Sequence, residues 1–264
     1  MHRALLFASL LATLAPAAAR AQERQVDRNA FAWAGDVPAG SWVQVRNLNG
    51  SIHVSAASGG KTEVSATKSW RYGDPRDVRF EVTKLAKGGV LICALWGESS
   101  CDERGYHSED HGWRRGDDVA VEFTVRVPAG VKVNVGTVNG SVDVDGAGGE
   151  VVASTVNGGI DASTSVGPVN ATTVNGDIRA TMRALAGDAD MRFATVNGNV
   201  VVTLPAAFDA DVEMSTVNGR FRSDYPVTLS GRIDPHHLRA TIGKGGRRLT
   251  FHTVNGDLEL RKGG

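Results

Sequence analysis

Apolar and polar positions recur in a fixed order around the tetrapeptide Thr-Val-Asn-Gly, which begins at residues 137, 155, 173, 195, 216 and 253. With the valine of each copy as position zero, positions −5, −3 and +4 are apolar in all six copies. In order, these positions hold Val133, Val151, Val169, Met191, Val212 and Leu249, then Val135, Ala153, Ala171, Phe193, Met214 and Phe251, then Val142, Ile160, Ile178, Val200, Phe221 and Leu258. Self-similarity of this kind predicts a repeat architecture, in which each unit buries its apolar face by stacking on its neighbours.

A seventh copy of the pattern surrounds Leu48-Asn49-Gly50, where the same offsets hold Val43, Val45, Ile52 and Val54. From residue 138 onward, the position-zero valines follow one another at intervals of 18, 18, 22, 21 and 37 residues. The last interval is about twice the first, which leaves room for a degenerate repeat between residues 220 and 250.

Two all-β arrangements are compatible with this pattern. Asn-Gly between alternating apolar residues is a strong signal for a two-residue hairpin turn, and serial hairpins would form an antiparallel meander. In that meander the position-zero valines would face away from the apolar columns. In a β-solenoid of 18–22-residue coils, a bend between positions −3 and 0 would let both short strands and the position-zero valine face inward. We therefore favour the solenoid and keep the hairpin meander as the alternative.

The repeated Asn-Gly pair then has a structural role, because it marks the same backbone point in every coil. Glycine tolerates close or left-handed backbone, and asparagine amides at one coil position can hydrogen-bond one above another as a ladder. Asn255 is in the last coil along the chain, so we expect it to have a neighbour on one side only. The residues of this structural repeat are Asn49, Gly50, Asn139, Gly140, Asn157, Gly158, Asn175, Gly176, Asn197, Gly198, Asn218, Gly219, Asn255 and Gly256.

The chain divides into a leader, a lead-in and one β-repeat domain. Residues 1–21 have a basic start, an apolar run and the small-x-small triplet Ala19-Arg20-Ala21, which predicts a signal peptide cleaved near Ala21. Residues 22–39 form the lead-in, and residues 40–262 the repeat domain. Within this domain, segment 61–127 departs from the repeat and reads as longer strands, which we expect to form an antiparallel insertion that caps the amino end of the solenoid.

Charge and hydropathy argue against nucleic acid as a partner and against a membrane-spanning chain. The 29 Lys and Arg residues balance the 29 Asp and Glu residues, and no basic stripe points to nucleic acid. The apolar run of the leader is too short to span a membrane comfortably, and no later stretch approaches its length. We expect an exported protein of the periplasm or the cell surface that is not an integral membrane protein. The pattern does not define an oligomeric state.

Cys93 and Cys101 are the only cysteines, and seven residues separate them. In an oxidising compartment they are expected to form a disulfide at the base of the polar loop from about residue 97 to 118. Two free buried thiols are the alternative.

No group of residues carries a recognisable catalytic, cofactor or metal site. His107, Asp110 and His111 lie close together in the polar loop, but they lack the order and the helical setting of a zinc motif. The acids near the repeats, Asp143, Asp161, Asp177 and Asp257, wander between positions +3 and +5 and form no column of carboxylates. We expect no metal, no cofactor and no enzymatic activity.

The lead-in Val127–Gly130 and the serial Thr-Val-Asn-Gly coils, which end at Thr253–Leu258, resemble the bacterial family called domain of unknown function 4097. Its members are classed as adhesins with β-strand repeats, and the resemblance covers roughly residues 40–262. It implies a right-handed β-helix-like fold, a binding role toward an unknown surface or envelope ligand, and no catalytic residues. An envelope-sensing module and a carbohydrate-active β-helix enzyme remain as alternative hypotheses.

Overall fold

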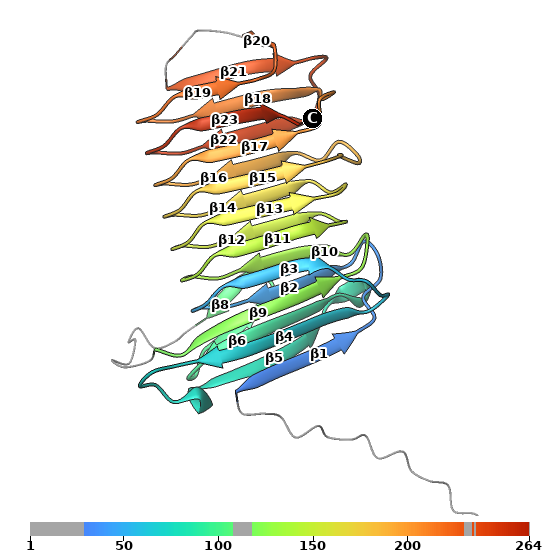
Figure 1. Ribbon diagram of the computed structural model, residues 1–264, viewed down its shortest axis with the longest axis vertical. Coiled ribbons are helices and arrows are strands. Elements are labelled where there is room, and N and C mark those ends of the chain that lie inside the picture. The colour runs from blue at the N-terminus through green and yellow to red at the C-terminus, as the bar shows by residue number, and fades with distance from the viewer. Residues whose placement is uncertain (1–28, 108–117, 230–233, 235, 264) are drawn as a thin grey trace, which may run out of the picture.

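The computed structural model describes residues 29–107, 118–229, 234 and 236–263, and within them it is an all-β protein. Ten of the described strands form one long sheet, here called sheet A, and eleven form a second, sheet B. The two sheets run along the long axis of the molecule, and the central strands of each pair in parallel with their neighbours (Figure 1). The chain is therefore a parallel β-solenoid and not a meander of antiparallel hairpins.

Each coil contributes one short strand to sheet B, turns through its Asn-Gly pair, and then contributes one strand to sheet A. In spatial order, the coil strands of sheet B are β2 (Trp42–Arg46), β10 (Lys132–Gly136), β12 (Val151–Ser154), β14 (Val169–Thr172), β16 (Met191–Ala194), β22 (Arg248–His252) and β18 (Ala210–Ser215). Those of sheet A are β3 (Ile52–Ala56), β11 (Val142–Ala147), β13 (Ile160–Thr164), β15 (Ile178–Met182), β17 (Val200–Leu204), β23 (Leu258–Lys262) and β19 (Phe221–Ser223).

The core lies between the two sheets, and the repeated apolar columns supply it. In the coil that starts at β12, for example, Val151, Ala153, Ile160 and Ala162 are all at most 1% exposed. The register keeps like residues in contact, because Val151 pairs with Val133 on one side and with Val169 on the other. Period-two alternation in two facing strands thus fills one continuous core along the stack.

The position-zero valines contradict the expectation that they face inward. Val156, Val174, Val196 and Val217 are 37–54% exposed, whereas the preceding threonines are at most 5% exposed. Alternation along the sheet B strand places positions −5, −3 and −1 inside, so the threonine is the third inward residue and the valine points out. The change of parity takes place at the Asn-Gly turn and not between positions −3 and 0.

The last coil along the chain is not the last coil of the stack. β22 pairs in parallel with β16 on one side and with β18 on the other, and β23 lies likewise between β17 and β19. The carboxyl-terminal coil is therefore inserted between two coils that precede it in sequence (Figure 1). Asn255 consequently has a neighbour on both sides, contrary to our expectation, and Asn218 occupies the end of the row.

The described residues of the 37-residue interval do not form a degenerate coil. It contains β20 (Val227–Leu229) and β21 (His237–Ile242), and β21 pairs antiparallel with β18 along its whole length. β20 pairs antiparallel with β21, so these two strands close the carboxyl end of sheet B. The long interval returns the chain to the slot between two earlier coils.

Segment 61–127 closes the opposite end of the stack and mixes two kinds of pairing. β4 (Thr62–Ser69) and β5 (Val78–Lys84) pair antiparallel, as expected, and β1 (Ala30–Gly35) adds to β4. In contrast, β6 (Val90–Trp96) and β9 (Ala120–Val127) pair parallel with β2 and β3. They continue both sheets as one further, wider coil at the base of the stack (Figure 1).

Aromatic side chains fill this wider end. Phe31 of β1 stacks on Phe80 of β5 with ring centroids 4.7 Å apart, and Phe80 meets the edge of Phe123 of β9 at 5.9 Å. Rings from both sheets therefore cover the end of the aliphatic core, which would otherwise be open to water. Two 3-10 turns, Pro75–Asp77 and Ala86–Gly88, complete the connections here.

Candidate binding surfaces

The stack has two narrow edges of different character. At one edge, here called the turn edge, the Asn-Gly turns of successive coils lie directly above one another. At the other, the loop edge, the chain passes from sheet A of one coil to sheet B of the next. In Figure 1 the tight turns line the left side of the stack and the longer loops its right side.

The threonines hold the turn edge together from inside. Each threonine hydroxyl donates to the carbonyl of the Asn-Gly glycine in the adjacent coil, as in Thr155 to Gly140 at 2.8 Å and Thr173 to Gly158 at 2.9 Å. The same bond recurs for Thr137, Thr195, Thr253 and Thr216. In the first coil Asn47 replaces threonine, and its amide donates to the carbonyls of Gly50 and Val121.

The asparagine ladder expected from the sequence is present along the whole turn edge. Each asparagine amide nitrogen donates to the side-chain oxygen of an adjacent asparagine at 2.8–3.0 Å, in the spatial order Asn49, Asn139, Asn157, Asn175, Asn197, Asn255 and Asn218. Every interior asparagine therefore donates one bond and accepts another. The two terminal members, Asn49 and Asn218, each take part in a single bond of the ladder.

A third ladder is formed by the residue directly after the glycine, at position +3. The Oδ1 atom of Asp177 accepts from the backbone N–H of Asn199 at 2.9 Å, Asn199 accepts from Asp257 at 2.8 Å, and Asp257 accepts from Arg220 at 3.0 Å. Because an aspartate and an asparagine oxygen are equivalent acceptors here, the column is continuous although its charge varies. Asp143 and Asp161 lie outside it, on the outer face of sheet A, where Asp143 is 3.3 Å from His53.

The polar atoms of the turn edge thus form hydrogen bonds between coils. The exposed valines, Val156, Val174, Val196 and Val217, stand between these ladders, one to a coil, and they do not line the loop-edge hollow described below. We infer that the tetrapeptide builds the stack and offers little specific chemistry to a ligand.

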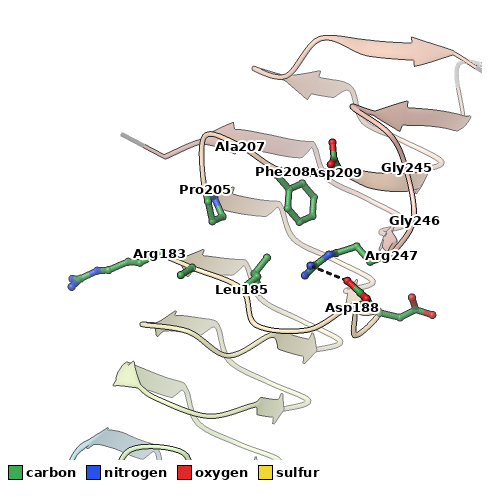
Figure 2. A pocket seen from close by; sticks show the side chains of 12 residues that line it. Arg183, Leu185, Asp188, Pro205, Ala207, Phe208, Asp209, Gly245, Gly246 and Arg247 are labelled. Carbon is green, nitrogen blue, oxygen red and sulfur yellow. Dashed lines mark ion pairs between the residues drawn. The ribbon is translucent and has the colours of Figure 1, made fainter.

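The loop edge contains a hollow of about 720 Å³ near the carboxyl end of the stack. Three connections surround it: residues 183–190 between β15 and β16, residues 205–209 between β17 and β18, and residues 243–247 between β21 and β22 (Figure 2). The inserted last coil brings the third of these beside the other two. The volume is in the range of ordinary small-molecule sites.

Arg247 and Phe208 form the centre of this loop-edge pocket (Figure 2). The Arg247 guanidinium lies over the Phe208 ring, 5.4 Å from its centroid, and its Nη2 atom donates to the Gly187 carbonyl at 2.6 Å. The Arg247 side chain is 13% exposed, and its carboxylate neighbour Asp188, 3.8 Å away, is 99% exposed. A cation–π contact of a partly buried guanidinium contributes about 1–2 kcal/mol.

Two further aspartates of the pocket hold its loops in place. Asp190 accepts from the backbone N–H of Arg248 at 2.8 Å, and Asp209 accepts from that of Lys244 at 3.0 Å. Each carboxylate therefore joins one loop of the pocket to the chain around β22. The arrangement fixes three connections that are far apart in the sequence.

The polar loop beyond β6 is tied back to the base of the stack. A disulfide joins Cys93 of β6 to Cys101 of β7 (Ser100–Asp102), whose Cα atoms are 6.6 Å apart. β7 pairs with β8 (Gly105–His107), and this hairpin covers Leu91, Cys93 and Leu95 on the outer face of β6. The Tyr106 hydroxyl donates to the Ala94 carbonyl, and burial raises the pKa of Tyr106.

Arg46 is the buried cation beneath this hairpin. Its guanidinium donates to the backbone and side-chain oxygens of Asn134 at 3.0 Å, to Gln44 at 3.0 Å and to the Glu103 carbonyl at 3.2 Å. Burial lowers the pKa of Arg46, and the nearby Tyr106, Asp102 and Glu103 oppose that effect. Its bonds are all internal, so we assign it to the attachment of the hairpin.

The remaining candidates from the sequence do not assemble into a site in the part of the chain that the structure describes. His107 contacts Asp102 at 3.0 Å, while Asp110 and His111 lie outside the described residues. Among the described residues, no three His, Cys, Asp or Glu side chains are grouped to hold a metal ion. None of the described helices could span a membrane. The expected signal peptide, residues 1–21, also lies outside the described residues.

Sequence reasoning missed the loop-edge pocket. None of its residues belongs to a motif, and they come from three separate connections. The available signal was the change of interval from 18 to 22 and 21 residues after position 174, since extra residues in a solenoid coil form longer loops on one face.

Comparison with known proteins agrees with the repeat pattern. Residues 42–261 match the family model described as Toastrack DUF4097. No curated protein shows a significant match. Among solved structures, one described as a "putative cell adhesion protein" from Clostridium sporogenes is similar, with 8% identity, a TM-score of 0.49, and coverage of 89% of this chain and 100% of that one. Another, described as a "putative adhesin" from Bacteroides fragilis, shows 10% identity, a TM-score of 0.40 and coverage of 89% and 98%.

Proposed function

The chain belongs to the Toastrack DUF4097 family, and on that basis we propose that it is a non-catalytic binding protein of the cell envelope or cell surface, in the manner of an adhesin. The contrast between its two edges carries the proposal. The turn edge is uniform and its polar atoms bond to neighbouring coils, while the loop edge varies from coil to coil and contains a pocket. In repeat proteins, insertions gather on one face, which is often the face that binds.

A rigid scaffold supports this role. Three hydrogen-bond ladders and a continuous core fix each coil to two neighbours, so the loops project from a surface that does not rearrange. Binding sites on loops held by a rigid scaffold lose less conformational entropy when a ligand binds. The proposed ligand-binding surface is the loop edge around Phe208 and Arg247.

The pocket carboxylates favour binding over catalysis. A glycoside-cleaving enzyme needs one carboxyl group in an apolar environment to act as an acid and a second one placed across the scissile bond. Here Asp188 is 99% exposed, and Asp190 and Asp209 accept backbone N–H groups. We therefore propose no reaction for this pocket.

Export is the second part of the proposal. It is supported by the leader-like residues 1–21 and by the Cys93–Cys101 disulfide, a bond typical of oxidising compartments. The mature chain would begin near Gln22 and would meet its ligand in the periplasm or at the cell surface.

Cell fractionation and a retention assay test this proposal together. We expect the full chain, expressed in its producing cells, to lose its leader and to appear outside the cytoplasm. The purified mature protein should then be retained on envelope material. Two substitutions in the pocket, Arg183→Ser and Phe208→Ser, should abolish retention.

The matched control changes two exposed valines of the turn edge, Val156→Ser and Val174→Ser, which should leave retention unchanged. A cytoplasmic chain with an intact leader would refute export. If the valine variant lost retention and the pocket variant kept it, the turn edge would be the binding surface and the proposal for the loop edge would be wrong. Copurification with one membrane signalling protein, in place of envelope material, would favour the envelope-sensing hypothesis.

A further inference from the structure

The loop-edge pocket lies where the repeat becomes irregular. In a regular coil, four residues (165–168) connect β13 to β14, whereas eight (183–190) connect β15 to β16. The connection 205–209 follows in the next coil, and 243–247 leads into the inserted coil. The eight-residue connection, twice the regular length, thus lies at the hollow together with these two five-residue connections.

One wall of the pocket is apolar. Phe208, Leu185, Pro205 and Ala207 line it, and the Phe208 ring stands between the loops (Figure 2). Two contacts fix this ring: the Arg247 guanidinium at 5.4 Å and the ring of Tyr225 at 6.3 Å. A fixed aromatic ring is a flat surface against which a ligand of similar width can pack.

The other wall has charges of both signs. Arg247 provides guanidinium donors, and Asp188, Asp190 and Asp209 provide carboxylate acceptors. Arg183 lies at the rim, and its side chain extends away from Phe208 and Arg247 (Figure 2). Asp188 is almost fully exposed, and among the described residues its side chain has only the ion pair to Arg247 at 3.8 Å. The Asp188 carboxylate is therefore available to a ligand without first breaking a buried interaction.

This mixture of charges discriminates among ligand classes. An anion would lie near three carboxylates, and a cation would lie near the Arg247 guanidinium, so the pocket would repel either kind of charge. A hydroxyl group both donates and accepts, and it can pair with either kind of side chain. A ligand with several hydroxyl groups and one apolar face suits the whole lining.

One buried atom adds to this argument. The Nη1 atom of Arg247 is buried and has no hydrogen-bond partner among the described residues, which is unfavourable for a polar atom. An oxygen acceptor would satisfy it. Because the atom is covered, a ligand oxygen reaches it only when the surrounding side chains shift slightly.

We propose that this pocket is a binding site for neutral sugars, with the sugar's C–H face against Phe208 and its hydroxyl groups on Asp188 and Arg247. The inference rests on the proposed function, because it names the ligand class of the same loop edge. The sugar would be one unit of a surface or envelope glycan.

Titration of the ¹⁵N-labelled mature protein, followed by amide chemical shifts, tests the proposal. The probes are methyl glucoside, methyl mannoside and methyl galactoside, with glucuronic acid and glucosamine as charged comparisons. We expect at least one neutral glycoside to shift the amides of Gly187, Gly245 and Gly246 at concentrations below about 50 mM. Glucuronic acid and glucosamine should bind at least about fivefold more weakly than that glycoside.

Substitutions then assign the contacts. Asp188→Asn changes an exposed side chain with little risk to folding, and it should weaken binding about threefold to tenfold. Phe208→Ala should remove detectable binding, with a thermal melt to confirm that it folds. Val166→Ala, on a regular loop of the same edge where Val166 is 42% exposed, is the matched control and should bind as the unchanged protein does.

No shift with any neutral glycoside, or tighter binding of a charged probe, would overturn the proposal. So would neutral-sugar binding that both pocket variants, Asp188→Asn and Phe208→Ala, retain. The test also separates this inference from the proposed function. Release of methanol from a glycoside that binds here would refute the non-catalytic role and leave the sugar site intact, whereas envelope retention without sugar binding would refute the sugar site alone.

Discussion

The turn edge and the loop edge face the same solvent and are built by the same coils, yet they are used differently. At the turn edge Thr173 and Asn175 bond to neighbouring coils, and the next coil repeats both bonds. At the loop edge no two connections around the pocket share a sequence, and Arg247 and Phe208 have no counterparts in other coils. The residues that repeat in every coil meet a structural requirement. The loop edge, where the repeat is interrupted, is the part of the molecule whose residues can vary with function.

The comparison also explains why the tetrapeptide is invariant in six coils. Thr-Val-Asn-Gly supplies one buried hydroxyl, one ladder amide and one residue without a side chain at the point of closest backbone approach. Its valine is the exception, because it is exposed and contributes little to the stack. Substitutions can therefore rank the positions of the turn edge against each other and against the loop edge.

The largest effect is expected for Gly158→Ala. A Cβ atom at Gly158 would overlap the backbone carbonyl of Gly140 in the adjacent coil, and backbone in a hydrogen-bonded ladder cannot move aside. Overpacking of this kind should lower the free energy of unfolding by about 3 kcal/mol or more. Gly59→Ala is the control, since a Cβ there has no neighbour within 4 Å. Denaturant melts in which both variants match the unchanged protein would mean that the turns are not closely stacked.

The second prediction concerns the β6–β9 coil, which has no Asn-Gly pair in the ladder. Between β6 and β9 the tight turn is replaced by the polar loop, which the Cys93–Cys101 disulfide ties to β6. Replacing both cysteines by serine should cost about 2–3 kcal/mol, the loss expected for a loop of this length. Mass spectrometry of non-reduced peptides checks the bond itself. Recovery of both cysteines as alkylated thiols from freshly exported protein would contradict it.

Thr173→Val and Val174→Ser form the third test, because the two residues are adjacent and differ in burial. Thr173 is 2% exposed and Val174 is 37% exposed. Thr173→Val removes the bond to the Gly158 carbonyl with little change of shape, and should cost about 1–2 kcal/mol. Val174→Ser should cost less than about 0.5 kcal/mol. If urea melts showed that Val174→Ser destabilises the protein more than Thr173→Val does, the valine and not the threonine would lie in the core.

The smallest effects separate interior from terminal members of the asparagine ladder. Asn175 and Asn255 each donate one ladder bond and accept another, while Asn218 only donates one. These bonds are exposed, so we expect about 1 kcal/mol for Asn175→Ala and for Asn255→Ala, and about half of that for Asn218→Ala. Parallel melts of the three variants measure the difference. If Asn255 behaved as the terminal residue, the last coil would not be inserted.

The repeat columns were sufficient to predict the solenoid, its core positions and the asparagine ladder. They could not orient the valine, because threonine and valine are both β-branched and the inward face depends on where the bend falls. They could not locate the last coil either. Phe251 fits equally well beside Phe193 or Met214, since every coil follows one template and the interfaces between coils are interchangeable.

The pocket was beyond prediction for a different reason. Arg183, Phe208 and Arg247 are far apart in the sequence, and only the inserted coil brings the third beside the other two. A site made by long-range topology has no local pattern to reveal it. The lengthened intervals between repeats indicated that the loop edge differs from coil to coil, but they indicated nothing about the chemistry of the pocket.

The inserted coil also determines when the chain can complete its fold. A chain that emerges amino end first can add its coils in order as far as β17, but β18 and β19 then reach their final neighbours only after residues 248–262 have arrived. These residues supply the partner strands on both sheets, and residues 245–247 just before them supply one wall of the loop-edge pocket. A chain that has not yet supplied residues 245–262 therefore has a stack without its inserted coil and a pocket without one of its three connections.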